Sequence, residues 1–238
     1  MDFKILLGDD GSGRTYVEWL MQAWGWTLTV ATLSWLVAMI IGTLMGTLRT
    51  LPNNPIITLL ANAWVELFRN IPVLVQVFLW YFVVPKMFPA MKEIPSLILV
   101  VLALGFFTSA RIAEQVRSGI QALPKGQRYA AMAMGFTTFE TYRYVILPMA
   151  FRIIMPPLTS ESMNLLKNSS VAFAVSIAEL TQYAMQVGEE TSKPTEIYLV
   201  VTVLYAVSAF AVNRAMGLVE KRIRIPGLVI AGNVGGGH

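Results

Sequence analysis

Long apolar stretches alternate with short polar segments along the chain. Residues 19–48 carry no charged side chain at all. Further apolar stretches, some of them interrupted by charges, cover 56–84, 94–110, 149–174 and 197–213. A helix of about 20 apolar residues spans the hydrocarbon core of a bilayer. We therefore expect an all-α integral membrane protein of about five transmembrane helices, with the second kinked at Pro72, which has no backbone N–H to donate.

Composition supports lipid as the surrounding medium. Hydrophobic residues make up 55% of the chain, charged residues only 13%, and the mean hydropathy is +0.60, whereas an average soluble domain is about 25% charged. The net charge of +4 does not indicate nucleic-acid binding, because the basic residues stand at the ends of apolar stretches, as membrane topology requires. The chain has no Cys, and its single His238 is the last residue, so we expect no cofactor and no metal site.

The distribution of Lys and Arg predicts the orientation. Cytoplasmic segments of membrane proteins are enriched in these residues. They are more numerous in the segments that are cytoplasmic when the N-terminus lies outside. This orientation makes residues 1–18 a periplasmic segment, 19–217 the transmembrane domain, and 218–238 a cytoplasmic tail. The loop 118–148 also becomes cytoplasmic.

A glycine-rich segment near the N-terminus almost matches a phosphate-binding loop. Residues 8–15 read GDDGSGRT, close to the pattern G-x4-G-K-[ST]. However, Arg14 replaces the required Lys, two Asp residues stand where phosphates would approach, and a membrane span follows directly. We interpret the segment as a flexible polar loop. If ATP drives this protein, another chain must therefore bind it.

The loop 118–148 predicts a helix–glycine–helix unit. Pro124 precedes an alanine-rich helix, and Gly135 stands where a helix end favours positive φ. Thr137 and Glu140 have capping-box spacing and predict a second short helix that ends near Leu147–Pro148. The tip is small and apolar, so another surface can approach it closely. Its small residues are Ala130, Ala131 and Ala133.

Polar side chains form stripes on two of the predicted spans. Helical spacing places Ser160, Glu161, Asn164, Lys167 and Asn168 on one face of the fourth span, opposite Leu158, Leu165 and Leu166. Glu66, Arg69 and Asn70 share a face of the second span, and Gln76 joins them only if the helix continues through Pro72. Charges at bilayer depth face protein or water. These stripes therefore either line a substrate path or pair internally, as Glu66 with Arg69 and Arg111 with Glu114.

Three classes of function compete on these observations. They are an importer permease with separate ATPases, a gradient-driven secondary transporter or channel, and a membrane-embedded enzyme. The sequence has no intramembrane His, no Cys and no paired acidic motif, which disfavours the enzyme. It has no convincing internal repeat, a feature common in secondary transporters. The choice between the importer and the gradient-driven transporter depends on the loop 118–148.

Two motifs resemble those of a known family. The loop resembles the coupling motif E-A-A-x3-G-x9-I-x-L-P of ATP-binding-cassette importer permeases, with Tyr129 in place of the usual Glu. The matching residues are Tyr129, Ala130, Ala131, Gly135, Val145, Ile146, Leu147 and Pro148. Residues 65–76 are similar to the polar amino-acid permease signature V-E-x-F-R-x-x-P-x-x-x-Q. Residues 164–169 also fit that family, and residues 219–227 resemble its glutamate/aspartate branch.

The resemblance implies a type I importer permease core (MetI-like) with cytoplasmic coupling helices, in a bacterial inner membrane. It implies a second permease subunit, two ATP-binding subunits that dock on the coupling residues, a periplasmic amino-acid-binding protein, and import of glutamate or aspartate. We expect this chain to be a transport subunit and not an enzyme. The candidate substrate-path residues are Glu66, Arg69, Gln76, Glu161, Asn164, Lys167 and Asn168.

Overall fold

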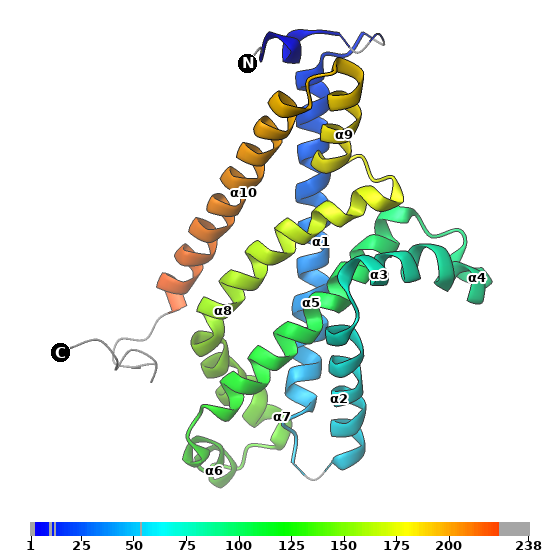
Figure 1. The fold of residues 1–238 in the computed structure, drawn as a ribbon. Helices are drawn as coiled ribbons and strands as arrows, with labels where there is room; N and C mark the ends of the chain where they lie inside the picture. The colour runs from blue at the N-terminus through cyan, green and yellow to red at the C-terminus, as the bar shows by residue number, and fades with distance from the viewer. Residues whose placement is uncertain (1–2, 10, 12, 53, 224–238) are drawn as a thin grey trace, which may run out of the picture.

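The computed structural model describes residues 3–9, 11, 13–52 and 54–223, and almost all of them are helical (Figure 1). The part of the predicted tail from residue 224 onward lies outside the described residues. In chain order the elements are η1 (Phe3–Leu7), α1 (Tyr16–Leu48), α2 (Pro55–Asn70), α3 (Val73–Phe78), η2 (Leu79–Val83), α4 (Val84–Met87), η3 (Pro89–Met91), α5 (Ser96–Gln121), α6 (Lys125–Ala133), α7 (Thr138–Glu140), η4 (Thr141–Ile146), α8 (Leu147–Asn168), η5 (Ser169–Val175), α9 (Leu180–Thr191) and α10 (Pro194–Ile223).

Three of the described helices, α1, α5 and α10, are long and apolar enough to cross a membrane, and α2 with α3–α4 makes a fourth if that bent pair is one span. Helix α8 has 22 residues, or about 33 Å at 1.5 Å per residue. It also carries Arg152, Glu161 and Lys167. That α8 is a fifth span stays a prediction.

The second span is broken at Pro72, where we expected only a kink. Pro55–Asn70 and Val73–Met87 meet at 107°. Ile71 leaves the helix with φ −97° and ψ 130°, because the residue before a proline is disfavoured in the α conformation. The amide of Gln76 bridges the break, since its Nε2 donates to the carbonyls of Phe68 at 2.8 Å and Ile71 at 3.0 Å.

Glycines let α1 pack unusually close to α5. A Cβ on Gly42 would lie 2.7 Å from the Ile112 side chain, and one on Gly46 would lie 2.7 Å from the Ala113 carbonyl. Small residues at helix interfaces allow such backbone approach in membranes, where dispersion contacts drive association. The close packing makes α1 and α5 the central pair against which α2 and α8 lie (Figure 1).

Helix α9 lies between the predicted apolar stretches 149–174 and 197–213, in a polar segment for which we had predicted no helix. Leu180, Tyr183, Ala184 and Val187 are buried against α1 and α10. Their spacing is that of an amphipathic helix. The buried Glu179 caps α9 by accepting from the backbone N–H groups of Thr181 and Gln182.

The outer surface of α1 and α10 is rich in large apolar side chains, which suits contact with lipid. The exposed ones on these helices include Leu28, Leu33, Leu36, Ile40, Leu44, Leu199, Val203, Val207 and Phe210. In contrast, the exposed side chains of α2, α5 and α8 include several charges. Helix α2 also exposes Ile56, Leu59, Leu60 and Leu67, and α10 exposes Arg214, Lys221 and Arg222 near its end, so neither kind of surface is confined to its own helices.

Candidate functional site

The short helices α6 and α7 form the end of the molecule opposite the start of α1 (Figure 1). Pro124 precedes α6, and Gly135 follows it with φ +89°. Thr137 and Glu140 form the expected capping box. Hydrogen bonds from the Thr137 N–H and hydroxyl hold the pKa of the Glu140 carboxyl below its usual value. Glycine and the capping box together set the turn of this unit.

The second helix of this unit does not end at Leu147–Pro148, contrary to our expectation. The chain passes from α7 through the π-helical η4 directly into α8, which begins at Leu147. Pro148 lies in the first turn of α8, where its missing N–H costs little. Leu147 packs against the cluster of Ile112 and Ile154. Leu147 and Pro148 therefore belong to the first turn of α8.

Large apolar side chains are exposed around α6 and α7. Those exposed there are Tyr129, Met132, Met134, Phe136, Phe139 and Tyr144. We call this set of six the apolar tip. Ala130 and Ala133 are also exposed. Ala131, in contrast, is only 1% exposed, so our interpretation of all three alanines as an outward face was wrong for Ala131. An exposed apolar patch of this kind marks an interaction site.

Charged side chains from α1, α2 and α5 converge on Glu114. Its carboxylate lies 2.8 Å from Arg49 Nη1, 3.7 Å from Arg69 Nη1 and 3.8 Å from Arg117 Nη1. Arg69 also pairs with Glu66 at 3.0 Å. The internal Glu66–Arg69 pair that the sequence left open is therefore present, while the Arg69 side chain remains 45% exposed.

A second ion pair connects α5 with α8. Arg111 Nη1 lies 3.8 Å from Glu161. We had expected Arg111 to pair with Glu114 from their i, i+3 spacing, and this was wrong, since the ion pairs described for Glu114 are with three other arginines. Side chains on other helices therefore determine which partners Arg111 and Glu114 have, and the sequence alone does not reveal these neighbours.

The polar stripe of α8 faces away from the subunit core. Leu158, Leu165 and Leu166 are buried, and Lys167 on the opposite face is exposed. The other stripe positions, Glu161, Asn164 and Asn168, are partly exposed. Within the described residues no ion-pair partner of Lys167 is present.

Gln76 does not belong to the exposed polar surface. The helix does not continue through Pro72, and Gln76 is 1% exposed in the core. The structure thus brings Glu66 and Arg69 together and leaves Gln76 apart from them. Gln76 instead bridges the break between α2 and α3 by its hydrogen bonds, a role that the sequence did not predict.

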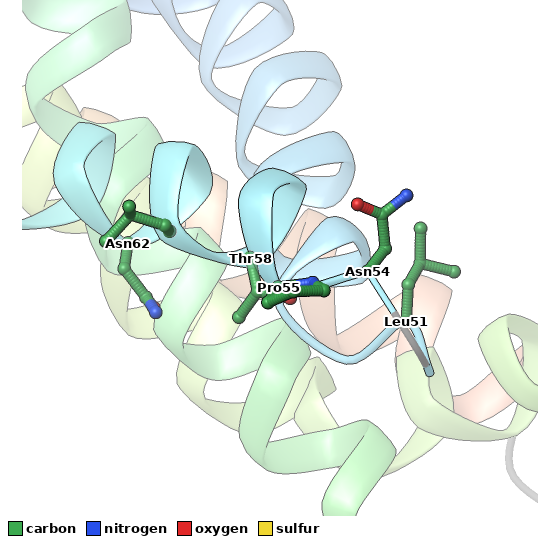
Figure 2. A pocket seen from close by; sticks show the side chains of 6 residues that line it. Leu51, Asn54, Pro55, Thr58 and Asn62 are labelled. Carbon is green, nitrogen blue, oxygen red and sulfur yellow. The ribbon is translucent and has the colours of Figure 1, made fainter.

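An open hollow of about 480 Å³ lies at the start of α2, shown in Figure 2. Its lining residues are Leu51, Asn54, Pro55, Thr58, Leu59 and Asn62. None of them carries a charge, and none belongs to the predicted substrate-path set. The hollow therefore has no evident relation to a charged substrate.

In the described part of the glycine-rich loop near the N-terminus, the backbone N–H groups of two glycines already have an acceptor. The Asp9 carboxylate accepts from the N–H groups of Gly11 at 2.7 Å and Gly13 at 3.0 Å. Both glycines have positive φ. The carboxylate occupies the place that an anion would need.

The chain is similar to known proteins over most of its length. Residues 18–225 match the family described as "Binding-protein-dependent transport system inner membrane component". The chain is 38% identical over 232 residues to the glutamate/aspartate import permease protein GltJ of Escherichia coli (strain K12), covering 93% of this chain and 92% of that protein.

Two solved structures are similar to the whole fold. One is described as the crystal structure of an amino acid ABC transporter with histidines. It has a TM-score of 0.74 and 30% identity, and the match covers 87% of this chain and 95% of that one. The other, the MetNI methionine ABC transporter in an inward-facing conformation, has a TM-score of 0.72 and 22% identity, with 88% and 98% covered. At that identity the second likeness concerns the fold alone, which is the predicted MetI-like core.

Proposed function

The chain belongs to the family of binding-protein-dependent transport system inner membrane components, and from that premise we propose that it carries glutamate or aspartate through the membrane. It is an amino-acid importer permease, a transport subunit that has no catalytic activity of its own. The acidic substrate is the finer part of the proposal. The likeness to a glutamate/aspartate import permease supports it.

The observation that carries the proposal is the charge balance of the exposed polar surface. Three glutamates there, Glu66, Glu114 and Glu161, each have an arginine within 4 Å. Three partly exposed arginines and Lys167 oppose these three carboxylates. The arginines are Arg69, Arg111 and Arg117, whereas Arg49, which also pairs with Glu114, is buried. The surface therefore has an excess of positive charge, which favours an anionic guest.

Lys167 is the best placed cation for this role. Each arginine in the set has a carboxylate partner, whereas Lys167 is exposed and has no ion-pair partner in the part of the chain that the structure describes. An unpaired ammonium at bilayer depth is costly unless it meets water or an anion. We expect Lys167 to attract a substrate carboxylate, with Arg69, still 45% exposed, as the second contact.

The charged surface and the apolar tip also support the proposed partner subunits. Lipid is an unfavourable neighbour for exposed charges, so we expect this face to lie against a second permease subunit across a water-filled path. The apolar tip is the expected dock for two ATP-binding subunits, one for each permease. A periplasmic amino-acid-binding protein delivers substrate to the other end, with the N-terminus outside and the C-terminus in the cytoplasm.

Uptake in proteoliposomes tests the proposal. The complex is reconstituted with its binding proteins and ATP, and uptake of glutamate, aspartate, glutamine and asparagine is measured. Lys167→Met and Arg69→Met should reduce acidic uptake far more than neutral uptake. Lys92→Met is the matched control, because it removes an exposed lysine in the segment between η3 and α5. Equal loss of acidic and neutral uptake would show that selectivity lies in the binding protein. Uptake without ATP would instead indicate a gradient-driven transporter.

A further inference from the structure

Arg49 is a buried charge at the point where α1 ends. Its side chain is 5% exposed, and its Nη1 lies 2.8 Å from Glu114 of α5. Its Nε donates to Asn62 Oδ1 of α2 at 2.6 Å. A buried charge is tolerated only with close partners, and losing one is strongly destabilising. Arg49 therefore fixes the end of α1 against both α2 and α5.

The residue after Arg49 is held by the unit that carries the apolar tip. The Tyr142 hydroxyl donates to the Thr50 carbonyl at 2.6 Å. Tyr142 lies in η4, is 5% exposed, and packs with Leu123, Ile146 and Ala150. Because η4 also contacts α6, a displacement of the tip must move Tyr142, and with it the backbone beside Arg49.

Glu114 is shared between Arg49 and the exposed Arg69. The Glu114–Arg49 distance is 2.8 Å and the Glu114–Arg69 distance is 3.7 Å. Arg69 also pairs with Glu66, but the two carboxylates of Glu66 and Glu114 cannot fully neutralise the three guanidinium groups around them, those of Arg49, Arg69 and Arg117. While Arg49 holds Glu114, Arg69 keeps part of its attraction for an anion. If Arg49 withdraws, Glu114 becomes available to Arg69 and this attraction falls.

We propose that Arg49 and Glu114 are positioning residues that couple the apolar tip to the charge that Arg69 presents in the substrate path. This inference rests on the proposed importer function. Movement of the tip acts through Tyr142 and Thr50 on Arg49. The Arg49–Glu114 pair then sets how strongly Arg69 attracts the substrate. The proposal requires two arrangements of this cluster, one in which Glu114 pairs with Arg49 and one in which it pairs with Arg69.

The test measures the ratio of amino acid imported to ATP hydrolysed, using whichever amino acid the wild-type complex takes up best. Tyr142→Phe removes only the hydroxyl that bonds Thr50, and Glu114→Gln keeps the shape but removes the charge. Both should lower the ratio roughly fivefold or more, the lower range of measured couplings between sites, while ATP hydrolysis continues. Tyr198→Phe is the matched control for Tyr142→Phe, because it removes the same hydroxyl from a tyrosine that is exposed on α10.

The double variant Tyr142→Phe/Glu114→Gln separates a relay from two independent losses. If both residues act on one route, the double variant should be no worse than the poorer single variant, since the effects are not additive. Independent, multiplying losses would overturn the proposal. So would a wild-type ratio in Tyr142→Phe, a result that decides the matter even if Glu114→Gln fails to assemble. A wild-type complex that imports no amino acid would instead overturn the proposed function.

Discussion

Gln76 donates its side-chain amide to the Phe68 carbonyl at 2.8 Å, across the break that separates the two halves of the second span. A second bond from the same nitrogen reaches the Ile71 carbonyl at 3.0 Å. The last carbonyls of a helix have no partner within the helix. In a membrane core no water is present to supply one. Gln76 therefore allows α2 to end inside the protein.

Replacing Gln76 by Leu should destabilise the protein, because it leaves these carbonyls unsatisfied. A buried unsatisfied polar group costs about 1–3 kcal/mol. The measurement is thermal unfolding of the detergent-solubilised complex. Gln121→Leu is the control, since Gln121 is exposed at the end of α5. Equal stability of the two variants would contradict the role assigned to Gln76.

Gly46→Ala should separate α1 from α5. The added Cβ would lie 2.7 Å from the Ala113 carbonyl and from Val116, and overpacking of this kind costs about 1–3 kcal/mol. Gly25→Ala places the same methyl group on the same helix with no atom within 4 Å, so it should be neutral or slightly stabilising. Unfolding temperatures in detergent compare the two. Similar melting of both variants would contradict the close packing.

Two adjacent alanines should respond differently to the same substitution. Ala130→Arg places a charge on the exposed surface beside the apolar tip, so the permease should insert and fold but lose its ATP-binding subunits on purification. Ala131 is 1% exposed, so Ala131→Arg should disrupt the α6 unit itself. Limited proteolysis of the loop and co-purification distinguish the two. Normal retention of the ATPases by Ala130→Arg would place their dock elsewhere.

The orientation predicts which positions an impermeant thiol reagent reaches. The chain contains no Cys, so a single introduced Cys reports alone. Ser192→Cys, in the exposed turn after α9, should label from outside in intact cells. Gly126→Cys, in a position where a side chain meets no atom within 4 Å, should label only after permeabilisation. The reverse pattern would invert the protein and remove the apolar tip from the cytoplasm.

Sequence patterns correctly predicted several features that depend on local signals. The span at 19–48, the positive φ of Gly135 and the capping box of Thr137 with Glu140 all have the form expected. The fold class is also confirmed. Helix α9 was missed because Glu189 and Glu190 make the segment between two predicted spans look polar. The spacing of Leu180, Tyr183, Ala184 and Val187 was a signal that could have revealed it.

Contacts between helices were harder to predict, because several partners compete for each charge. Spacing along one helix correctly paired Glu66 with Arg69. The same rule failed for Arg111, which reaches Glu161 on α8, because a tertiary neighbour replaced the local one. The burial of Ala131 was missed for a related reason, since a run of alanines does not indicate which of them is buried and which is exposed.

The exposed charges on α2 and α8 have a consequence for how the protein is made. A newly inserted copy that has not met its partner would expose Arg69 and Lys167 to lipid, a state that is costly. Such an orphan should be short-lived, recognised by membrane quality control and degraded. Production of this subunit alone should therefore yield little protein, and co-production of the remaining subunits should raise its cellular half-life.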